Sequence, residues 1–479
     1  MAARSDEPNL YRRPWTPDEE EHDACAIIAN VRKTGEASHG NVKRTLEALA
    51  KMGHRTGDVD GEGDGCGVLT DIPRKLWMQF LEEAERPGAL ALDRRFSVGH
   101  FFIPREARHE SWRIKEHVLG RLRASGFELL AEREGAVRSL ALGKRAREQE
   151  PEFWQVVGLC GGCPTDQIDR KLFDLQMQIE RETPIHVASF SAHSVVYKVR
   201  GTVETLYHYY PDLRSSNFLS AITIGHSRYS TNTLSVFERV QPFSLLGHNG
   251  ELNTIAQLRA EAQMLGAQLI VGGSDSQDLN RLLETLIHRY GFTLLEAMEM
   301  AFPPIGPELE KAPPELKALY TFYRQAWGPY AQGPAAVVAR YADECIFSVD
   351  ALGLRPLWYG ETEKEHFFSS EKGVVPLDIM VRDPKPLAPG EKMAVRVRRG
   401  QGVEVLEYPE VQAAALQLAR ARFAARQADV AQKRYRRYQA DAVAEMEPAW
   451  SAAVGATRGS AEARTYFPTR PAPVNDPAP

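Results

Sequence analysis

The sequence predicts an α+β protein whose sheets are built from antiparallel strands. Between residues 220 and 380, short apolar strands gather in runs, at 221–225, 243–246, 335–341, 344–349 and 366–369. Helices are expected at 254–266, 276–290 and 314–326, without regular strand-helix alternation. Strands in runs favour antiparallel pairing. The apolar fraction of 43% and the charged fraction of 26% are those of a soluble globular protein.

Composition excludes several functional classes. The chain has 479 residues and a net charge of -5, which argues against general affinity for nucleic acid. No apolar run approaches the ~20 residues that cross a bilayer. Five cysteines, odd in number and thinly spread, do not make a disulfide framework. The acidic N-terminus lacks the features of a secretory signal, so we expect a cytoplasmic protein that binds no membrane.

The first 200 residues mix both kinds of element. Residues 1–24 are polar and proline-containing, and we interpret them as a poorly ordered leader. A buried strand is expected from Cys25 to about residue 31, and an amphipathic helix at 41–52. Further helices are expected at 75–85, 107–124 and 167–182, and strands at 97–103, 127–132, 137–142 and 186–199.

A glycine-rich stretch at residues 53–67 is too irregular for a helix or strand. It lacks the Gly-Lys-Ser/Thr of a phosphate loop, and its acids would repel an anion. Asp58, Asp60 and Glu62 fall at alternating calcium-ligand positions, but Leu69 stands where the bidentate glutamate belongs. A close-packed turn leading into a strand at 68–72 is the favoured interpretation.

Cys160 and Cys163 form a CxxC motif, which is typical of a redox pair or of half a metal site. No second pair supplies the other two ligands, and no thioredoxin-like pattern surrounds the motif. A turn with two half-buried thiols is the alternative.

The C-terminal part changes character after a hairpin expected at 392–398 and 403–408. Residues 411–450 form a basic helical extension, which is either a solvated surface helix or a docking helix for an acidic partner. Residues 451–479 are predicted to be a proline-rich disordered tail.

Four short stretches carry groups that could hold and cleave an amino-acid amide. Arg228 offers a planar fork of donors that matches a carboxylate, and Asp275 offers an anion for an ammonium group. Asn249 and Gly250 follow a strand in a tight turn, which can point two donors at one oxyanion. Cys25 is a candidate nucleophile. The alternative is a loop network in which His226, Arg228 and Asp275 only pair with one another.

The motifs resemble a known family. In chain order they are Cys25, HR at 54–55, GDGCGVL at 63–69, YYPDL at 209–213, HSRYSTNT at 226–233, HNGELNT at 248–254, SDS at 274–276, GPAA at 333–336, GLRP at 353–356 and SSEKGV at 369–374. From about residue 23 to 400 this order resembles the amino-terminal glutaminase domain of glutamate synthase large subunits, which are class II glutamine amidotransferases.

The resemblance implies an N-terminal nucleophile (Ntn) hydrolase fold, a four-layer αββα sandwich with two antiparallel sheets, over residues 25–410. It implies that a leader is cut between Ala24 and Cys25, so that Cys25 gains a free α-amino group. Its thiolate would attack the side-chain amide of L-glutamine, with Asn249 and the Gly250 N–H as oxyanion donors. By the same resemblance, Arg228 binds the substrate carboxylate and Asp275 its ammonium group.

Two departures from the family pattern bear on function. Ala26 stands where the family has glycine, and its methyl group could crowd the backbone beside the substrate. The large subunits continue into domains that bind FMN and an iron-sulfur cluster, and these have no counterpart in the sequence. We therefore expect no cofactor in this chain and a separate FMN-dependent, glutamate-synthase-like subunit. The alternatives are an amidotransferase subunit for another acceptor, and a non-catalytic glutamine-sensing or scaffold protein that keeps its leader.

Overall fold

The structure, a computed structural model, describes residues 25–59, 61–228, 234–328 and 331–432. The predicted leader at 1–24, the tail at 451–479 and residues 433–450 of the extension lie outside these ranges. Among the helices of the described ranges, none combines the length and the apolar character needed to cross a bilayer.

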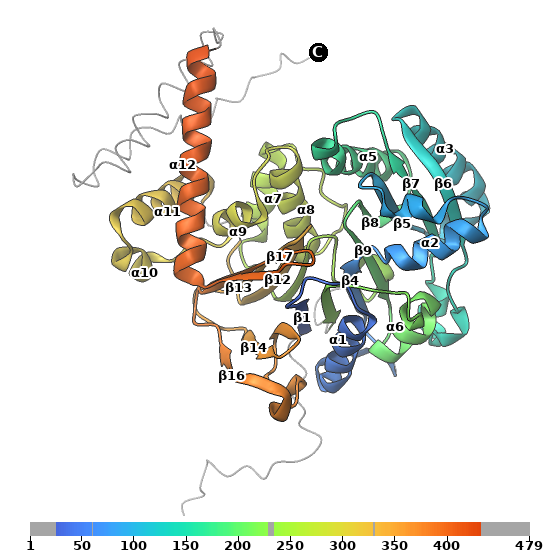
Figure 1. Ribbon diagram of the computed structural model, residues 1–479, viewed down its shortest axis with the longest axis horizontal. Helices are drawn as coiled ribbons and strands as arrows, with labels where there is room; N and C mark the ends of the chain where they lie inside the picture. Colours follow the sequence, from blue (N-terminus) through green and yellow to red (C-terminus); the bar gives the residue numbers. More distant parts are fainter. Residues whose placement is uncertain (1–24, 60, 229–233, 329–330, 433–479) are drawn as a thin grey trace, which may run out of the picture.

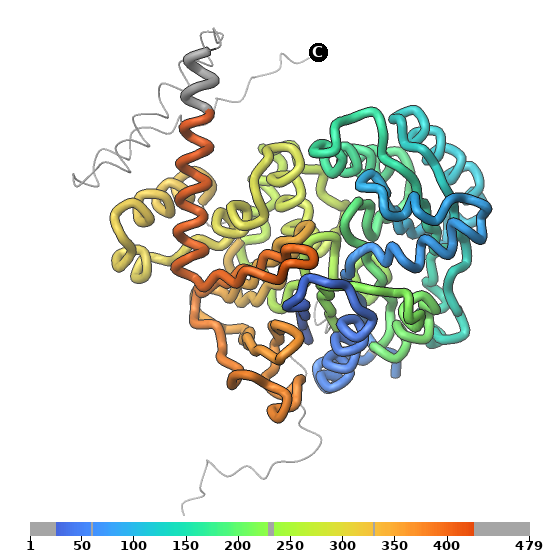
Figure 2. Tube along the Cα trace, in the orientation of Figure 1, coloured from blue at the N-terminus to red at the C-terminus, as the bar shows by residue number. Residues whose placement is uncertain are grey.

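The central element is a seven-stranded antiparallel sheet with β1 (Ala26–Arg32) in its interior. β1 pairs with β10 (Ile222–Ser227) on one side and with β15 (Glu365–Ser369) on the other. Figure 2 shows the blue start of the described chain in the middle of the molecule, among later segments. The full order is β16 (Met380–Pro386), β14 (Trp358–Thr362), β15, β1, β10, β4 (Cys66–Asp71) and β9 (Ser194–Val199).

A second antiparallel sheet has five strands. Its order is β11 (Leu246–Gly250), β12 (Ala335–Tyr341), β13 (Glu344–Val349), β17 (Lys392–Arg398) and β18 (Gly402–Leu406). β12 and β13 occupy the predicted ranges. β11 begins three residues later than the predicted strand at 243–246, because Phe243 and Leu245 are buried against the helices instead of pairing in the ladder.

The two sheets pack face to face and bury a common core. Ile27, Ala29 and Val31 of β1 lie in one apolar cluster with Val338 and Phe347 of the second sheet. Their outer faces are covered by helices, α1 (His39–Lys51) and α6 (Val203–Tyr209) on the first sheet, and α7 (Ile255–Met264), α8 (Asp275–His288), α9 (Leu294–Ala301), α10 (Gly306–Lys311) and α11 (Pro314–Trp327) over the second. The predicted αββα sandwich is confirmed (Figure 1).

A lobe beside this sandwich, at the right of Figure 1, has its own four-stranded sheet. The strand order is β6 (Phe127–Glu134), β7 (Glu152–Cys160), β5 (Phe96–Ile103) and β8 (His186–Ser191), with helices α2 (Arg74–Glu83), α3 (Ser111–Ala124), α4 (Lys144–Glu148) and α5 (Ile168–Glu182). The predicted strand at 186–199 is two strands, because the chain turns at Ala192 and His193 and β9 joins the seven-stranded sheet.

Two local predictions were wrong. The strand expected at 137–142 is a short 3-10 turn, Ser139–Ala141, whose residues are not buried. The glycine-rich stretch does contain regular structure. It has a 3-10 turn at Gly53–Arg55 and a short hairpin of two strands with two residues each, β2 (Asp58–Val59) and β3 (Glu62–Gly63). Its turn positions need glycine, since Gly61 has a φ of +78°.

Helix α12 (Tyr408–Gln432) starts the predicted extension and packs on the sandwich. Val411, Ala415 and Ala419 are buried against the helices that cover the five-stranded sheet. Arg422 forms an ion pair with Glu296 of α9, with 2.8 Å between Nη2 and Oε2. The first half of this helix is therefore part of the core (Figure 1).

Candidate active site

Cys25 lies immediately before β1, at the end of the seven-stranded sheet where β1 begins and β10 ends. Side chains alternate along a strand. Ala26 and Ile28 belong to the core on the α1 face, whereas Ile27 and Ala29 belong to the core between the sheets. Continuing this alternation places Cys25 on the face turned toward the second sheet. Cys25 is half-buried and is not in a disulfide.

Arg228 lies at the same end of the sheet, because β10 is antiparallel to β1. Ala26 pairs with Ser227, so the residue after β10 lies beside the residue before β1. Arg228 is 5% exposed, and its Nη1 donates to the Leu234 carbonyl at 3.1 Å. Burial lowers the pKa of its guanidinium, and the nearby charges of Asp64, Cys25 and Asp275 counteract this. The structure thus brings Arg228 close to both Cys25 and Asp275.

Asp64 is a site residue that the motif analysis did not single out. It is fully buried, and its Oδ1 lies 3.7 Å from Nη1 of Arg228. The backbone N–H of Arg228 donates to the carbonyl of Gly65 at 2.7 Å, which holds the loop before β4 against the end of β10. The only signal for Asp64 in the sequence was its place in the motif at 63–69.

Asn249 enters the site from the second sheet. On β11, Leu246 packs among the helices, and a side chain at Gly247 would lie near Ile224 and His226 of the first sheet. By alternation Asn249 also faces the first sheet. It is fully buried, and neither atom of its carboxamide has a hydrogen-bond partner in the described part of the chain. A buried polar group left in this way costs about 1–3 kcal/mol unless something fills the position, as a substrate oxygen would.

Gly250 follows at the end of β11, with a φ of +130°. A Cβ atom there would lie 1.8 Å from the carbonyl oxygen of Pro334. The backbone of the GPAA motif at 333–336 therefore packs directly on this residue. Only glycine fits there. The tight turn predicted at Asn249 and Gly250 was wrong, because both are the last residues of β11 and pair with Ala336 and Ala335 of β12.

Asp275 is the first residue of α8. Its Oδ2 accepts a hydrogen bond from the backbone N–H of Leu252 at 2.9 Å, and its Oδ1 accepts one from Ser276 N–H at 2.7 Å. The first of these bonds ties the start of α8 to the segment that follows β11. A carboxylate held in this way is placed to receive a substrate ammonium group.

A buried hydrogen-bond network joins the two sheets and α8 behind these residues. His226 Nε2 lies 3.1 Å from the His248 carbonyl, and His248 Nδ1 lies 2.8 Å from Ser276 Oγ. Gln241 accepts a hydrogen bond from His248 N–H at 2.7 Å. Desolvation lowers the pKa of His226 to about 3 and also lowers that of His248, so both rings are neutral at pH 7. These bonds join different elements, so His226, Arg228 and Asp275 do not simply pair with one another.

The methyl group of Ala26 does not face Cys25. Ala26 is fully buried and belongs to the core on the α1 side of the sheet. The Ala26 methyl group therefore lies on the opposite face of the strand from Cys25 and does not crowd the substrate side.

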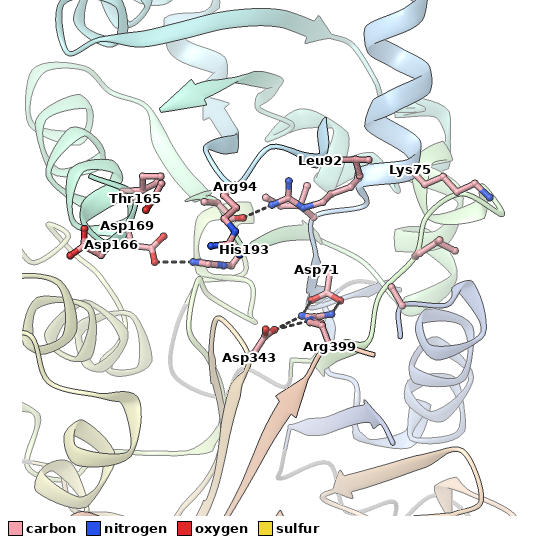
Figure 3. Close-up of a pocket in the computed structure, with 16 residues that line it drawn as sticks. Asp71, Lys75, Leu92, Arg94, Thr165, Asp166, Asp169, His193, Asp343 and Arg399 are labelled. Atoms are coloured by element: carbon pink, nitrogen blue, oxygen red, sulfur yellow. Dashed lines mark hydrogen bonds and ion pairs between the residues drawn. The ribbon is translucent and has the colours of Figure 1, made fainter. Parts of the chain in front are cut away.

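Other candidate features lie elsewhere. The cavity in Figure 3, about 880 Å³, lies at the opposite end of β4, near Asp71, roughly 16 Å from the Cys66 end of this six-residue strand. Figure 3 shows Arg399 between Asp71 and Asp343, with both of which it forms ion pairs. Cys160 and Cys163 lie in the lobe. No group of three His, Cys, Asp or Glu side chains able to hold a metal ion occurs in the described ranges.

A comparison with protein families decides the assignment. The family model "Glutamine amidotransferases class-II" matches residues 25–417. The chain belongs to the class-II glutamine amidotransferases. The match begins at Cys25 and includes every residue placed above at the edge where β1 and β10 meet.

Relatives of this amidotransferase chain are large glutamate synthases. Ferredoxin-dependent glutamate synthase 2 of Synechocystis sp. is 33% identical over 426 residues, which cover 82% of this chain and 26% of that protein. The glutamate synthase [NADPH] large chain of Azospirillum brasilense is 30% identical over 410 residues, covering 80% and 27%. The chain thus spans about a quarter of the length of these relatives.

Among solved structures, glutamine phosphoribosylpyrophosphate amidotransferase from B. subtilis, complexed with ADP and GMP, covers 80% of this chain and 49% of that chain. It is 15% identical and has a TM-score of 0.38.

Proposed function

We propose that the chain is a glutaminase that hydrolyses L-glutamine to glutamate and ammonia through a thioester on Cys25. The observation that carries the proposal is the buried carboxamide of Asn249, which has no partner in the described residues and, by alternation with Gly247, faces the sheet that contains β1. Arg228 and Asp275 lie close to each other and have opposite charges, as the two ends of an α-amino acid require.

The reaction requires that Cys25 be the first residue of the mature chain. An α-amino group has a pKa of about 8, so near neutral pH it can accept the thiol proton. The sulfur then attacks the side-chain carbonyl carbon of glutamine. In the tetrahedral intermediate the oxygen carries negative charge, which the Asn249 side chain and the Gly250 N–H stabilise.

Collapse of this intermediate breaks the C–N bond, and the nitrogen leaves as ammonia after taking up the proton held by the amine. Water, activated by the same amine, attacks the thioester and releases glutamate and the free thiol. Arg228 binds the substrate carboxylate through its planar fork, and Asp275 binds the ammonium group. Together they hold the substrate amide next to the sulfur throughout.

Two measurements on the full chain test the proposal. The intact mass of protein purified from its own cells should lack residues 1–24. Cys25→Ser should abolish glutamine hydrolysis and labelling by a glutamine-like electrophile, whereas Cys163→Ser should retain both. Hydrolysis that survives in Cys25→Ser would rule out the thioester. A mass that keeps the leader, together with glutamine binding but no turnover, would instead favour the sensing or scaffold function.

For the ammonia, we propose transfer to a separate glutamate-synthase-like subunit that carries FMN and an iron-sulfur cluster, with no cofactor on this chain. The names of the relatives support this acceptor, since each is a glutamate synthase. Affinity purification from native cells should recover a flavoprotein that, with an added electron donor, reductively aminates 2-oxoglutarate to glutamate only when this chain and glutamine are present. Recovery of a different acceptor enzyme would instead favour an amidotransferase subunit of another pathway.

A further inference from the structure

The CxxC motif lies outside the sandwich that holds the catalytic residues. Cys160 is the last residue of β7, an inner strand of the lobe sheet, where it pairs with Phe127. It is fully buried in the apolar cluster of the lobe, and Cys163 packs against the same cluster while half-buried. One thiol is therefore shielded and the other is accessible.

Both cysteines belong to the same apolar cluster of the lobe, three positions apart along the chain. The pKa of Cys160 is raised to about 11, first by burial and then by the nearby Cys163. Neither cysteine is in a disulfide in this structure. Of the other cysteines, Cys66 and Cys345 are fully buried in the sandwich.

The turn between the thiols is held by contacts that do not involve sulfur. The N–H of Gly161 donates to the Gly126 carbonyl at 3.1 Å, and Gly162 has a φ of +72°, which suits glycine. The ammonium group of Lys171, on α5, donates to the carbonyls of Gly161 and Ser125. The chain thus bends between the two cysteines, at Gly162 and Cys163, and the turn is held without either sulfur.

Lys171 also places a positive charge beside the pair. Its charge acts on Cys160 in the direction that lowers a thiol pKa. A nearby cation favours the thiolate, which is the reactive form in thiol-disulfide exchange.

We propose that Cys160 and Cys163 are a redox-active dithiol that exchanges with low-molecular-weight disulfides to form an internal disulfide. The Cys163 thiolate attacks one sulfur of the external disulfide, whose S–S bond breaks and releases one thiolate. The Cys160 thiol loses its proton to solvent, and its sulfur attacks Cys163 and displaces the second thiolate. The pair loses two electrons, and the external disulfide becomes two thiols.

Closure constrains the segment that follows the motif. Thr165 and Asp166 follow Cys163 after one intervening residue, Pro164, and line the cavity of Figure 3 together with Asp169 near the start of α5. A disulfide would tie this wall of the cavity to the end of β7. Disulfide formation would thus constrain the lobe and would not involve the residues of the glutaminase site.

The test uses the full chain carrying Cys25→Ser, so that the proposed nucleophile cannot react. The protein is equilibrated with mixtures of reduced and oxidised glutathione, alkylated and mapped by peptide mass. We expect a peptide with Cys160 and Cys163 joined and two hydrogens fewer. Its oxidised-to-reduced ratio should follow the glutathione disulfide concentration divided by the square of the thiol concentration, as a two-electron exchange requires.

Variants separate the roles of the two sulfurs. Added Cys160→Ala should trap glutathione on Cys163, and added Cys163→Ser should leave Cys160 reduced. Cys345→Ser is the matched control and should retain the disulfide. If Cys160→Ala does not fold, the half-buried Cys163→Ser still tests the proposal. Either full alkylation of both cysteines at every glutathione ratio, or a mixed disulfide on Cys163 that never closes, would overturn it.

Discussion

Asn249 shows how much of the proposed chemistry rests on one side chain. Its carboxamide is buried and has no partner among the described residues, which is costly unless a ligand oxygen binds there. Asn249→Ala should lower kcat by about 100- to 1,000-fold, because one donor to the oxyanion is lost, with little change in KM. Steady-state glutaminase kinetics measure both. Asn253→Ala, at an exposed position four residues later, is the control and should keep the kcat of the parent.

Arg228 and Asp64 should differ in how they affect substrate binding. Arg228→Lys keeps the charge but loses the planar fork, so we expect KM for glutamine to rise roughly 10- to 100-fold. Asp64 is a positioning residue, 3.7 Å from Nη1 of Arg228. Asp64→Asn should raise KM less and leave kcat nearly unchanged.

The same kinetics distinguish a loss of carboxylate binding in Arg228→Lys from a general loss of structure. Arg95→Lys, in an ion pair with Asp93 on the distant lobe, should keep the parent KM. A KM in Arg228→Lys equal to that of Arg95→Lys would assign carboxylate binding to another residue.

At the scale of elements, helix α12 should contribute to stability through its first turns. Ala415 is fully buried and Ala413 is exposed on the same helix. Ala415→Asp would bury an unpaired charge and should lower the free energy of unfolding by about 3 kcal/mol or more. Ala413→Asp should stay within about 0.5 kcal/mol of the parent. Urea unfolding gives both values, and equal midpoints would show that this part of the helix does not pack on the core in solution.

Two kinds of pattern predicted elements correctly. Helix α5 has one buried face, and strands β12 and β13 are short, almost wholly buried apolar runs; all three occur where expected. β7 is buried to the same degree but was missed, because Gln155 and Gly158 interrupt its apolar run. β11 was displaced because apolar residues that pack on helices precede it.

The residue types of the candidate site could be chosen from the sequence, but their assembly could not. Motif order and side-chain type selected Cys25, Arg228, Asn249, Gly250 and Asp275. Their proximity depends on β1 pairing with β10, some 200 residues away, and on β11 facing both, which no local pattern encodes. Asp64 had no signal that set it apart, since it is one of four acids in a glycine-rich stretch. Its role follows only from its contact with Arg228.

At the scale of the whole molecule, neutral buried histidines should set the acid limit of stability. Desolvation lowers the pKa of His226 to about 3 and those of His100, His288 and His366 to about 4. In the unfolded chain each has a pKa of about 6.5. Below pH 6.5 the unfolded state therefore binds protons that the folded state does not, and the free energy of unfolding decreases as the pH is lowered.

The pH range in which the histidines lower stability is separate from the range in which the carboxylates do. Asp71, whose pKa is lowered by Arg340 and Arg399 against the effect of its burial, loses its contribution only below its ordinary value near 4. Glu284, whose pKa burial raises, acts in the opposite direction, but the histidines outnumber it. Between pH 6.5 and 5, each neutral histidine should remove up to about 1.4 kcal/mol of stability per pH unit.

Thermal unfolding measured from pH 8 to 5 tests this. Tm should change little above pH 7 and fall progressively below 6.5. In His366→Gln the slope of unfolding free energy against pH should decrease by about one proton, because this side chain no longer titrates in the unfolded state. His109→Gln, at an exposed position, should keep the parent slope. A Tm that holds constant down to pH 5 would mean that these rings take up protons in the folded protein, and hence that water reaches the sheets where the structure places them in the core.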